Sequence, residues 1–71
     1  MKYNGLWRND KERIAIFRTV EDIIIHYRKV DERGNKLSGI HKELADEVLT
    51  EYTKEGSGMS YEEYCNLHKE S

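Results

Sequence analysis

The chain has 71 residues, of which 37% are apolar and 37% charged, and its formal net charge is −2. So short a chain makes one domain, 1–71, with a thin core and a stability of about a few kcal/mol, which excludes a large catalytic domain with a deeply supported cleft. A single cysteine, Cys65, excludes an internal disulfide. Because neither a signal peptide nor a membrane span is visible, we expect a protein of a reducing cytoplasm.

Charge is distributed unevenly along the chain. Residues 1–39 carry nine Lys or Arg against six Asp or Glu, a net of about +3, whereas residues 40–71 carry three against eight, about −5. Such polarity favours docking on a charged partner, although solvated faces of an ordinary domain give the same count.

Two segments rich in β-branched and aromatic residues, 13–20 and 22–30, predict central strands. Alternation along a strand assigns their side chains to two faces. On the first segment Ile14 and Ile16 oppose Ala15 and Phe17, and on the second Ile23, Ile25 and Tyr27 oppose Ile24, His26 and Val30.

A helix over 19–33 is the alternative, with Thr19 as its cap and Gly34 as its stop. Three consecutive isoleucines disfavour it, because β-branching restricts their rotamers in a helix. A hairpin connection after Val30, in which Gly34 and Asn35 take positive φ, also favours strands.

Shorter strands complete the predicted sheet. Residues 3–8 predict a first strand, which turns through 9–12 into the second, and about 35–39 predict a short fourth strand. The expected sheet is therefore an antiparallel meander of three or four strands over about 3–39.

Two helices are predicted after the sheet. Ile40, Leu44, Val48 and Tyr52 recur at helical spacing and predict a helix over about 40–55 that ends at Gly56. A second helix, about 61–70, has marked start signals: Ser60 as N-cap, Glu63 to complete a capping box, and Met59 placed to contact Tyr64. The predicted fold class is α+β, with both helices packed on one face of the sheet.

No catalytic motif is present, and we expect neither an enzyme nor a cofactor. The glycines are scattered at turns, no Gly-x-Ser-x-Gly occurs, and the carboxylates lie on predicted solvent faces. His26, His41, Cys65 and His68 form the best metal hypothesis, but only Cys65 and His68 are close in sequence, so we expect no metal site.

Protein binding is the function class that we favour, partly by elimination. Tyrosine, tryptophan, arginine and methionine are enriched in interfaces. The candidate protein-binding residues are Trp7, Arg8, Tyr52, Met59, Tyr61, Tyr64 and Leu67. They could equally be core, or they could form a homodimer through the C-terminal helices.

Nucleic-acid binding is the alternative, because basic residues accompany aromatics on the predicted strands. Its candidate residues are Arg13, Arg18, Arg28, Lys29, Arg33 and Lys36. A sequence pI near 5.9 argues against it, since nucleic-acid-binding domains are typically more basic.

Small size, absence of proline, high charge and one unpaired cysteine resemble, in style, accessory proteins carried by bacteriophages and prophages. This resemblance implies a small regulator or inhibitor that acts in the host cytoplasm without a membrane partner. It transfers no residue roles.

Overall fold

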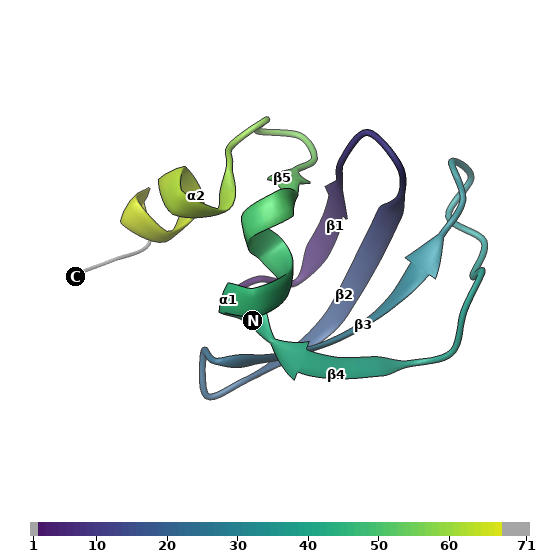
Figure 1. Ribbon diagram of the computed structural model, residues 1–71, viewed down its shortest axis with the longest axis horizontal. Helices are drawn as coiled ribbons and strands as arrows, with labels where there is room; N and C mark the ends of the chain where they lie inside the picture. The colour runs from purple at the N-terminus through teal and green to yellow at the C-terminus, as the bar shows by residue number, and fades with distance from the viewer. Residues whose placement is uncertain (1, 68–71) are drawn as a thin grey trace.

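A computed structural model describes residues 2–67, which form an α+β structure with a five-stranded antiparallel sheet in the order β4-β3-β2-β1-β5 (Figure 1). Two short α-helices and one 3-10 turn, η1, follow or interrupt the strands. The elements are β1 Gly5–Arg8, β2 Arg13–Val20, β3 Ile24–Val30, β4 His41–Leu44, α1 Ala45–Val48, η1 Leu49–Glu51, β5 Thr53–Lys54 and α2 Tyr61–Leu67.

The two central strands follow the predicted alternation except at Ile23, which was assigned to the face of Ile25 but lies in the turn before β3 and is 53% exposed. β2 has the predicted bounds, β3 begins two residues later than predicted, and the alternative helix over 19–33 is wrong. Ile14, Ile16 and Ile25 are buried, whereas Phe17 on the other face is 45% exposed. The buried side chains of β2 and β3 lie on one face of their shared ladder, and burying that face favours two strands over a helix.

The turn between β2 and β3 was not predicted, and it is held by two residues of unusual conformation. Glu21 and Asp22 have φ of 55° and 60°, and the Ile23 N–H donates to the Val20 carbonyl at 3.0 Å. Positive φ at both central residues is the pattern of a type I′ turn, which matches the twist of a hairpin but favours Asn-Gly. A glutamate in this conformation is strained by about 1 kcal/mol or more.

Replacing Glu21 and Asp22 by Asn and Gly should therefore stabilise the protein by about 1 kcal/mol and raise Tm by several degrees, because both new residues tolerate positive φ. Thermal unfolding followed by circular dichroism measures the change. Glu21→Gln is the matched control, since it removes the charge and keeps the strain. An equal gain in that control would assign the effect to charge rather than to the turn.

The connection from β3 to β4 replaces the predicted fourth strand. Within 35–39, only an isolated bridge between Lys36 and Val30 is present. Gly34 has the predicted positive φ of 88°, whereas Asn35 does not. The Asp31 carboxylate accepts from the Asn35 N–H at 2.9 Å, so it holds a tight loop in which a strand cannot form.

The predicted helix over 40–55 is wrong in extent. Its first residues form β4, which pairs with β3 along His41–Leu44, and only Ala45–Glu51 are helical. Ile40 and Leu44 are 53% and 42% exposed, so the apparent helical stripe contains only the later apolar residues. Pairing with β3 outweighs local helical spacing because it satisfies backbone groups that would otherwise lie at an open sheet edge.

The chain reverses again after η1, where the prediction continued the helix. β5 adds a fifth strand beside β1, and Gly56 and Gly58, with φ of 93° and 72°, form the following turn. The Lys54 N–H donates to the Met59 carbonyl at 2.8 Å and closes this turn.

The start of α2 is confirmed in detail. The Glu63 N–H donates to Ser60 Oγ at 3.2 Å, and the Ser60 N–H donates to Glu63 Oε1 at 3.0 Å. This is the predicted capping box. Residues 68–70 of the predicted helix lie outside the described part of the chain.

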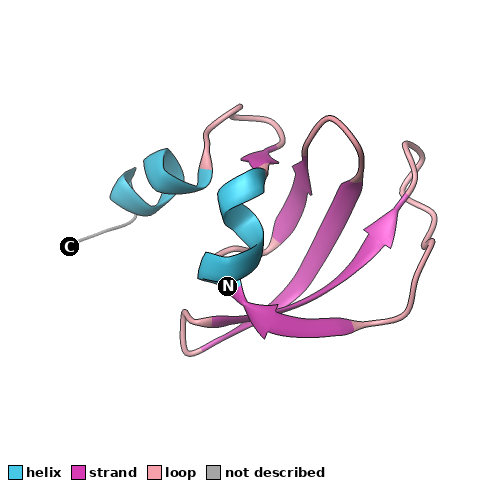
Figure 2. Cartoon of the chain, viewed as in Figure 1, coloured by secondary structure: helices cyan, strands magenta, loops and turns pink. Residues whose placement is uncertain are grey.

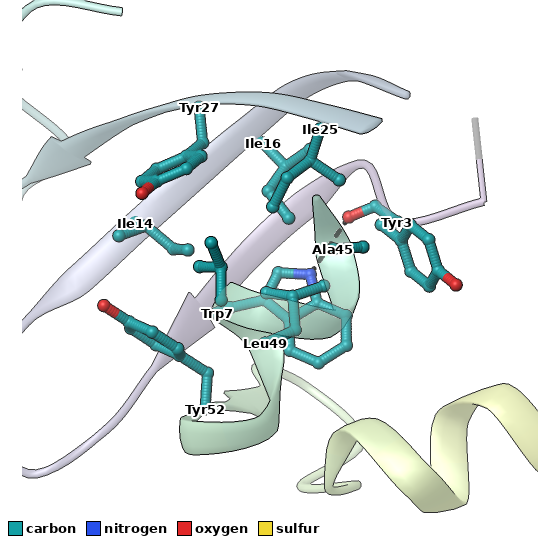
Figure 3. Packing of buried hydrophobic residues seen from close by; sticks show 10 residues of the cluster. Tyr3, Trp7, Ile14, Ile16, Ile25, Tyr27, Ala45, Leu49 and Tyr52 are labelled. Carbon is teal, nitrogen blue, oxygen red and sulfur yellow. Dashed lines mark hydrogen bonds between the residues drawn. The ribbon is translucent and has the colours of Figure 1, made fainter. Parts of the chain in front are cut away.

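The core lies between the sheet and the α1–η1 segment. Trp7, Ile14, Ile25 and Leu49 are its most deeply buried side chains, and the Trp7 Nε1–H donates to the Tyr3 carbonyl at 3.0 Å (Figure 3). The core therefore joins β1, β2, β3 and η1 around one indole ring.

The helices accompany only one face of the sheet, the face that carries the core (Figure 2). The ladder register assigns the opposite set of side chains to a second face. We call this second face the open face; its central residues are Ala15, Phe17, Arg18, Val20, Ile24, His26, Arg28, Lys42 and Leu44.

Candidate binding site on the open face of the sheet

A β-bulge in β2 forms the centre of the open face. The register shifts between Ile16, which pairs with Tyr27, and Arg18, which pairs with His26. Phe17 is the extra residue, and its ring meets that of His26 edge-on at 6.2 Å. The bulge therefore adds an aromatic ring beside Arg18 on one surface, as bulges commonly do where a side chain has to be redirected.

Apolar side chains at the β4 end of the open face border a shallow hollow of about 480 Å³. Ile24 and Leu44, directly opposite each other in the ladder, are 38% and 42% exposed. Its rim is mixed in charge, with His26, Lys42 and Glu47; Val20 and Glu43 complete the lining, although the Glu43 carboxylate accepts from the Tyr27 hydroxyl on the core face. The hollow offers apolar contact area and polar groups of both signs.

Arg28 is the open-face residue whose chemistry is least satisfied. Its guanidinium carbon lies 5.1 Å from the centre of the Phe17 ring, a cation–π contact. Its Nε is buried and has no hydrogen-bond partner among the described residues. An unpaired buried donor costs about 1–3 kcal/mol, and an acceptor from another molecule reaches this one only if the side chain moves off the Phe17 ring.

The basic residues at the β1 end of the sheet are, in contrast, neutralised. Glu55 accepts from Arg8 Nε at 2.9 Å and from Arg13 Nε at 2.6 Å, and Arg8 also contacts Glu32 at 2.5 Å. The hydrogen bonds from Arg13 and then Arg8 lower the pKa of Glu55 to about 2. This cluster ties β5 to β1 and β2.

Acid should release that cluster. Because the Glu55 pKa falls from 4.5 to about 2 on folding, its contribution is complete above pH 4.5 and is lost as pH falls toward 2. We expect Glu55→Gln to lower the free energy of unfolding by about 1 kcal/mol at neutral pH, discounted for solvent exposure, and to flatten the acid limb. Urea unfolding at several pH values measures both. If the stability of the variant fell at acidic pH as steeply as that of the wild type, the Glu55 cluster would not be the cause of that fall.

Two of the predicted protein-binding residues belong to the core. Trp7 is 0% exposed and Tyr52 is 8% exposed, so neither presents a surface. The Tyr52 hydroxyl donates to the Glu12 carboxylate, and burial followed by this bond raises the tyrosine pKa. Their large apolar rings are needed inside so small a domain, which is the physical reason for the correction.

The predicted tyrosines of α2 also pack on the core. The Tyr64 ring meets Trp7 edge-on at 5.2 Å, and its hydroxyl donates to the Lys2 carbonyl at 2.6 Å. The centres of the Tyr61 and Tyr3 rings lie 5.7 Å apart, and the Tyr61 hydroxyl donates to the Asp46 carboxylate. These contacts attach α2 to its own sheet.

The remaining candidates of that set do not converge. Arg8 belongs to the Glu55 cluster, and Met59 is half-buried beside the turn that follows β5. Leu67, 64% exposed, is the one predicted member whose side chain is largely open to solvent among the described residues.

The predicted nucleic-acid residues divide among several locations. Arg13 is paired with Glu55, and Lys29 Nζ lies 3.3 Å from Glu12 Oε1 in a second ion pair. Arg33 is exposed in the β3–β4 loop, and Lys36 borders a second hollow with Arg28. Arg18 and Arg28 are the two that lie on the open face, and Lys42, which was not predicted, lies on the same face.

Within the described residues, the candidate metal ligands do not come together as a set. His26 lies on the open face, His41 stacks on Tyr27 at 5.1 Å, and Cys65 Sγ lies 3.7 Å from the Tyr3 hydroxyl. His68 is outside the described range. From residue 2 to 67, no group of three or more His, Cys, Asp or Glu could hold a metal ion.

Sequence reasoning missed Ile24, Leu44, His26 and Lys42 as site residues. The available signal was the second apolar face of the central strands, where Phe17 and Ile24 alternate with core residues. Leu44 and Lys42 could join that face only once residues 41–44 were recognised as a strand.

Comparison with protein-family models, with curated proteins and with solved structures gives no match. None of the helices found in residues 2–67 has the length and apolar character needed to cross a bilayer. The open face is therefore interpreted from its own geometry.

Proposed function

We propose that this is a non-catalytic binding protein whose open face receives an acidic, partly apolar segment of another protein. The observation that carries the proposal is Arg28, whose buried Nε has no acceptor among the described residues. A partner carboxylate that draws the guanidinium off the Phe17 ring would satisfy the donor and form a charge-assisted hydrogen bond.

The charged and the apolar side chains of the open face both favour an acidic, partly apolar partner. Arg18, Arg28 and Lys42 have no ion pair among the described contacts, whereas Arg8 and Arg13 at the β1 end do. Beside the three free cations lie the exposed apolar side chains of Phe17, Ile24 and Leu44. A segment that alternates carboxylates with apolar residues complements both features, and an arginine at the centre of such a patch is typical of interface hot spots.

Binding alone suffices for a small regulator or inhibitor, which acts by occupying a surface of its target. This role needs no metal centre, and the described residues bring together no metal-ligating set. The phage-type origin considered from composition stays part of the proposal.

Single-stranded nucleic acid is the second candidate for the same surface. The Phe17 ring is 45% exposed and lies between His26 and Arg28, an arrangement on which a base can stack. The acidic sequence pI of about 5.9 makes it the weaker candidate.

A comparative capture experiment tests the proposal. Immobilised wild type, Arg28→Ala and Arg33→Ala are exposed to the same native lysate, and bound proteins are quantified by mass spectrometry. Arg33 is exposed in the β3–β4 loop, so its variant matches the charge change away from the open face.

We expect one protein to be retained by wild type and Arg33→Ala and to fall at least tenfold with Arg28→Ala, as for a hot-spot arginine. Equal retention by all three variants would contradict the proposal. Labelled single-stranded oligonucleotides supply the other arm: salt-dependent binding that is lost in Arg28→Ala would replace the protein partner by nucleic acid.

A further inference from the structure

β4 is the one long edge of the sheet in the described part of the chain. The strand order puts β4 at one end and the two-residue β5 at the other, where Thr53 also bridges to Ser60 (Figure 1). No described segment pairs with the outer side of β4. A strand edge of this kind is a template for another strand.

The hydrogen-bond register shows which backbone groups point outward. The Ala45 N–H donates to the Ile23 carbonyl at 2.9 Å. Bonded residues alternate in an antiparallel ladder, so Glu43 also faces β3, whereas Lys42 and Leu44 direct their N–H and C=O groups away from the sheet. The same alternation directs Ile40 outward, and the side chains of these three outward residues lie on the open face.

We propose that a second copy of this chain binds to this edge, with the two β4 strands antiparallel about a twofold axis at Lys42. In this register Ile40 pairs with the partner's Leu44, and Leu44 pairs with the partner's Ile40. These side chains are 53% and 42% exposed, and each pairing covers apolar surface on both copies. Cross-strand apolar pairs of this kind are the basic unit of sheet stabilisation.

The other face of the edge is complementary in the same register. His41 would face the partner's Glu43, and Glu43 would face the partner's His41. Within one copy these two side chains already approach to 4.0 Å, between Nδ1 and Oε2. The neighbouring register, centred on Glu43, opposes two carboxylates at the axis and is therefore less favourable.

The proposed register has one unfavourable contact, because Lys42 lies opposite Lys42 of the second copy across the axis. The two ammonium groups are carried on long flexible stems and can diverge into solvent above the open face. The two like charges weaken the dimer without preventing it. Removing the charge should therefore strengthen the dimer, and blocking the strand edge should abolish it.

Pairing at β4 would join two five-stranded sheets into one, with their open faces side by side. A partner with two acidic segments would then meet two copies of Arg28 and bind with avidity. Dimerisation itself does not depend on the proposed function, and its test contains no partner.

Sedimentation equilibrium over a range of protein concentrations measures the dimer for wild type, Lys42→Thr and Lys42→Pro. Threonine removes the like charge and retains the N–H. Proline removes an N–H that faces away from β3, so the ladder within one copy is retained. Circular dichroism checks that each variant is folded, and Leu44→Lys provides a second disrupting variant at an exposed position.

We expect a concentration-dependent dimer for wild type, a dissociation constant that falls about two- to fivefold in Lys42→Thr, and monomers for Lys42→Pro and Leu44→Lys. A wild type that stays monomeric at about 1 mM, where even a standard free energy near −4 kcal/mol gives dimers, would overturn the proposal. So would a dimer that neither disrupting variant weakens, because it would form through another surface.

Discussion

Replacing Trp7 by alanine should abolish the cooperative thermal transition. The indole is 0% exposed, is bonded to the Tyr3 carbonyl at 3.0 Å and contacts Tyr64. Truncating a buried tryptophan costs about 3–5 kcal/mol, which is comparable with the whole stability of a domain of this size. Far-UV and near-UV circular dichroism against temperature measure the loss.

Leu67→Ala is the control for Trp7→Ala, because it truncates an apolar side chain that is 64% exposed. It should change the free energy of unfolding by less than about 0.5 kcal/mol. A Trp7→Ala protein with the wild-type Tm would mean that the indole is not the centre of the core.

The second large effect is expected from Tyr64→Ala, which should destabilise the protein by about 2–3 kcal/mol and release α2 from the sheet. The variant loses ring contacts with Trp7 at 5.2 Å and with Tyr3 at 6.2 Å, as well as the hydroxyl bond to the Lys2 carbonyl. A seven-residue helix is unstable alone, so it unfolds when its packing is removed. Hydrogen exchange across Tyr61–Leu67 measures the release.

Tyr64→Phe separates the ring from the hydroxyl. It retains the contact with Trp7 and should cost only about 1 kcal/mol, the value of one hydrogen bond. If Tyr64→Ala instead left stability and exchange unchanged while weakening the binding of a partner, Tyr64 would belong to an interface and the assignment of α2 to the core would be wrong.

Local patterns predicted the parts of this fold that local interactions decide. The alternation of Ile14 and Ile16 with Ala15 and Phe17 predicted the faces of the first half of β2, and the Ser60–Glu63 pair marked the start of α2, because both signals act within a few residues. Both agree with the structure without help from the rest of the chain.

Segments decided by distant partners were not predictable in the same way. Ile40 and Leu44 have helical spacing with Val48, yet His41–Leu44 form a strand because β3 offers an edge to pair with. Asp22 tolerates positive φ but Glu21 does not favour it, so the pair does not reveal a type I′ turn, and the register of the hairpin imposes it.

The candidate site was harder to predict than the fold, because its residues become a surface only when the sheet order is known. Aromatic content drew attention to Trp7 and Tyr64, which a small core requires inside. The distinction between Arg13, which is neutralised, and Arg28, which is not, depends on where β5 places Glu55.

The central claim is that the open face, rather than the helical side, binds the partner. Nuclear magnetic resonance of the isotope-labelled protein, titrated with the partner recovered in the capture experiment, tests it most directly. We predict that the amide and side-chain signals that shift first are those of Phe17, Ile24, His26, Arg28 and Leu44, with α2 unchanged. Shifts confined to Tyr61–Leu67 and the α1–η1 segment, with Arg28 unaffected, would contradict it.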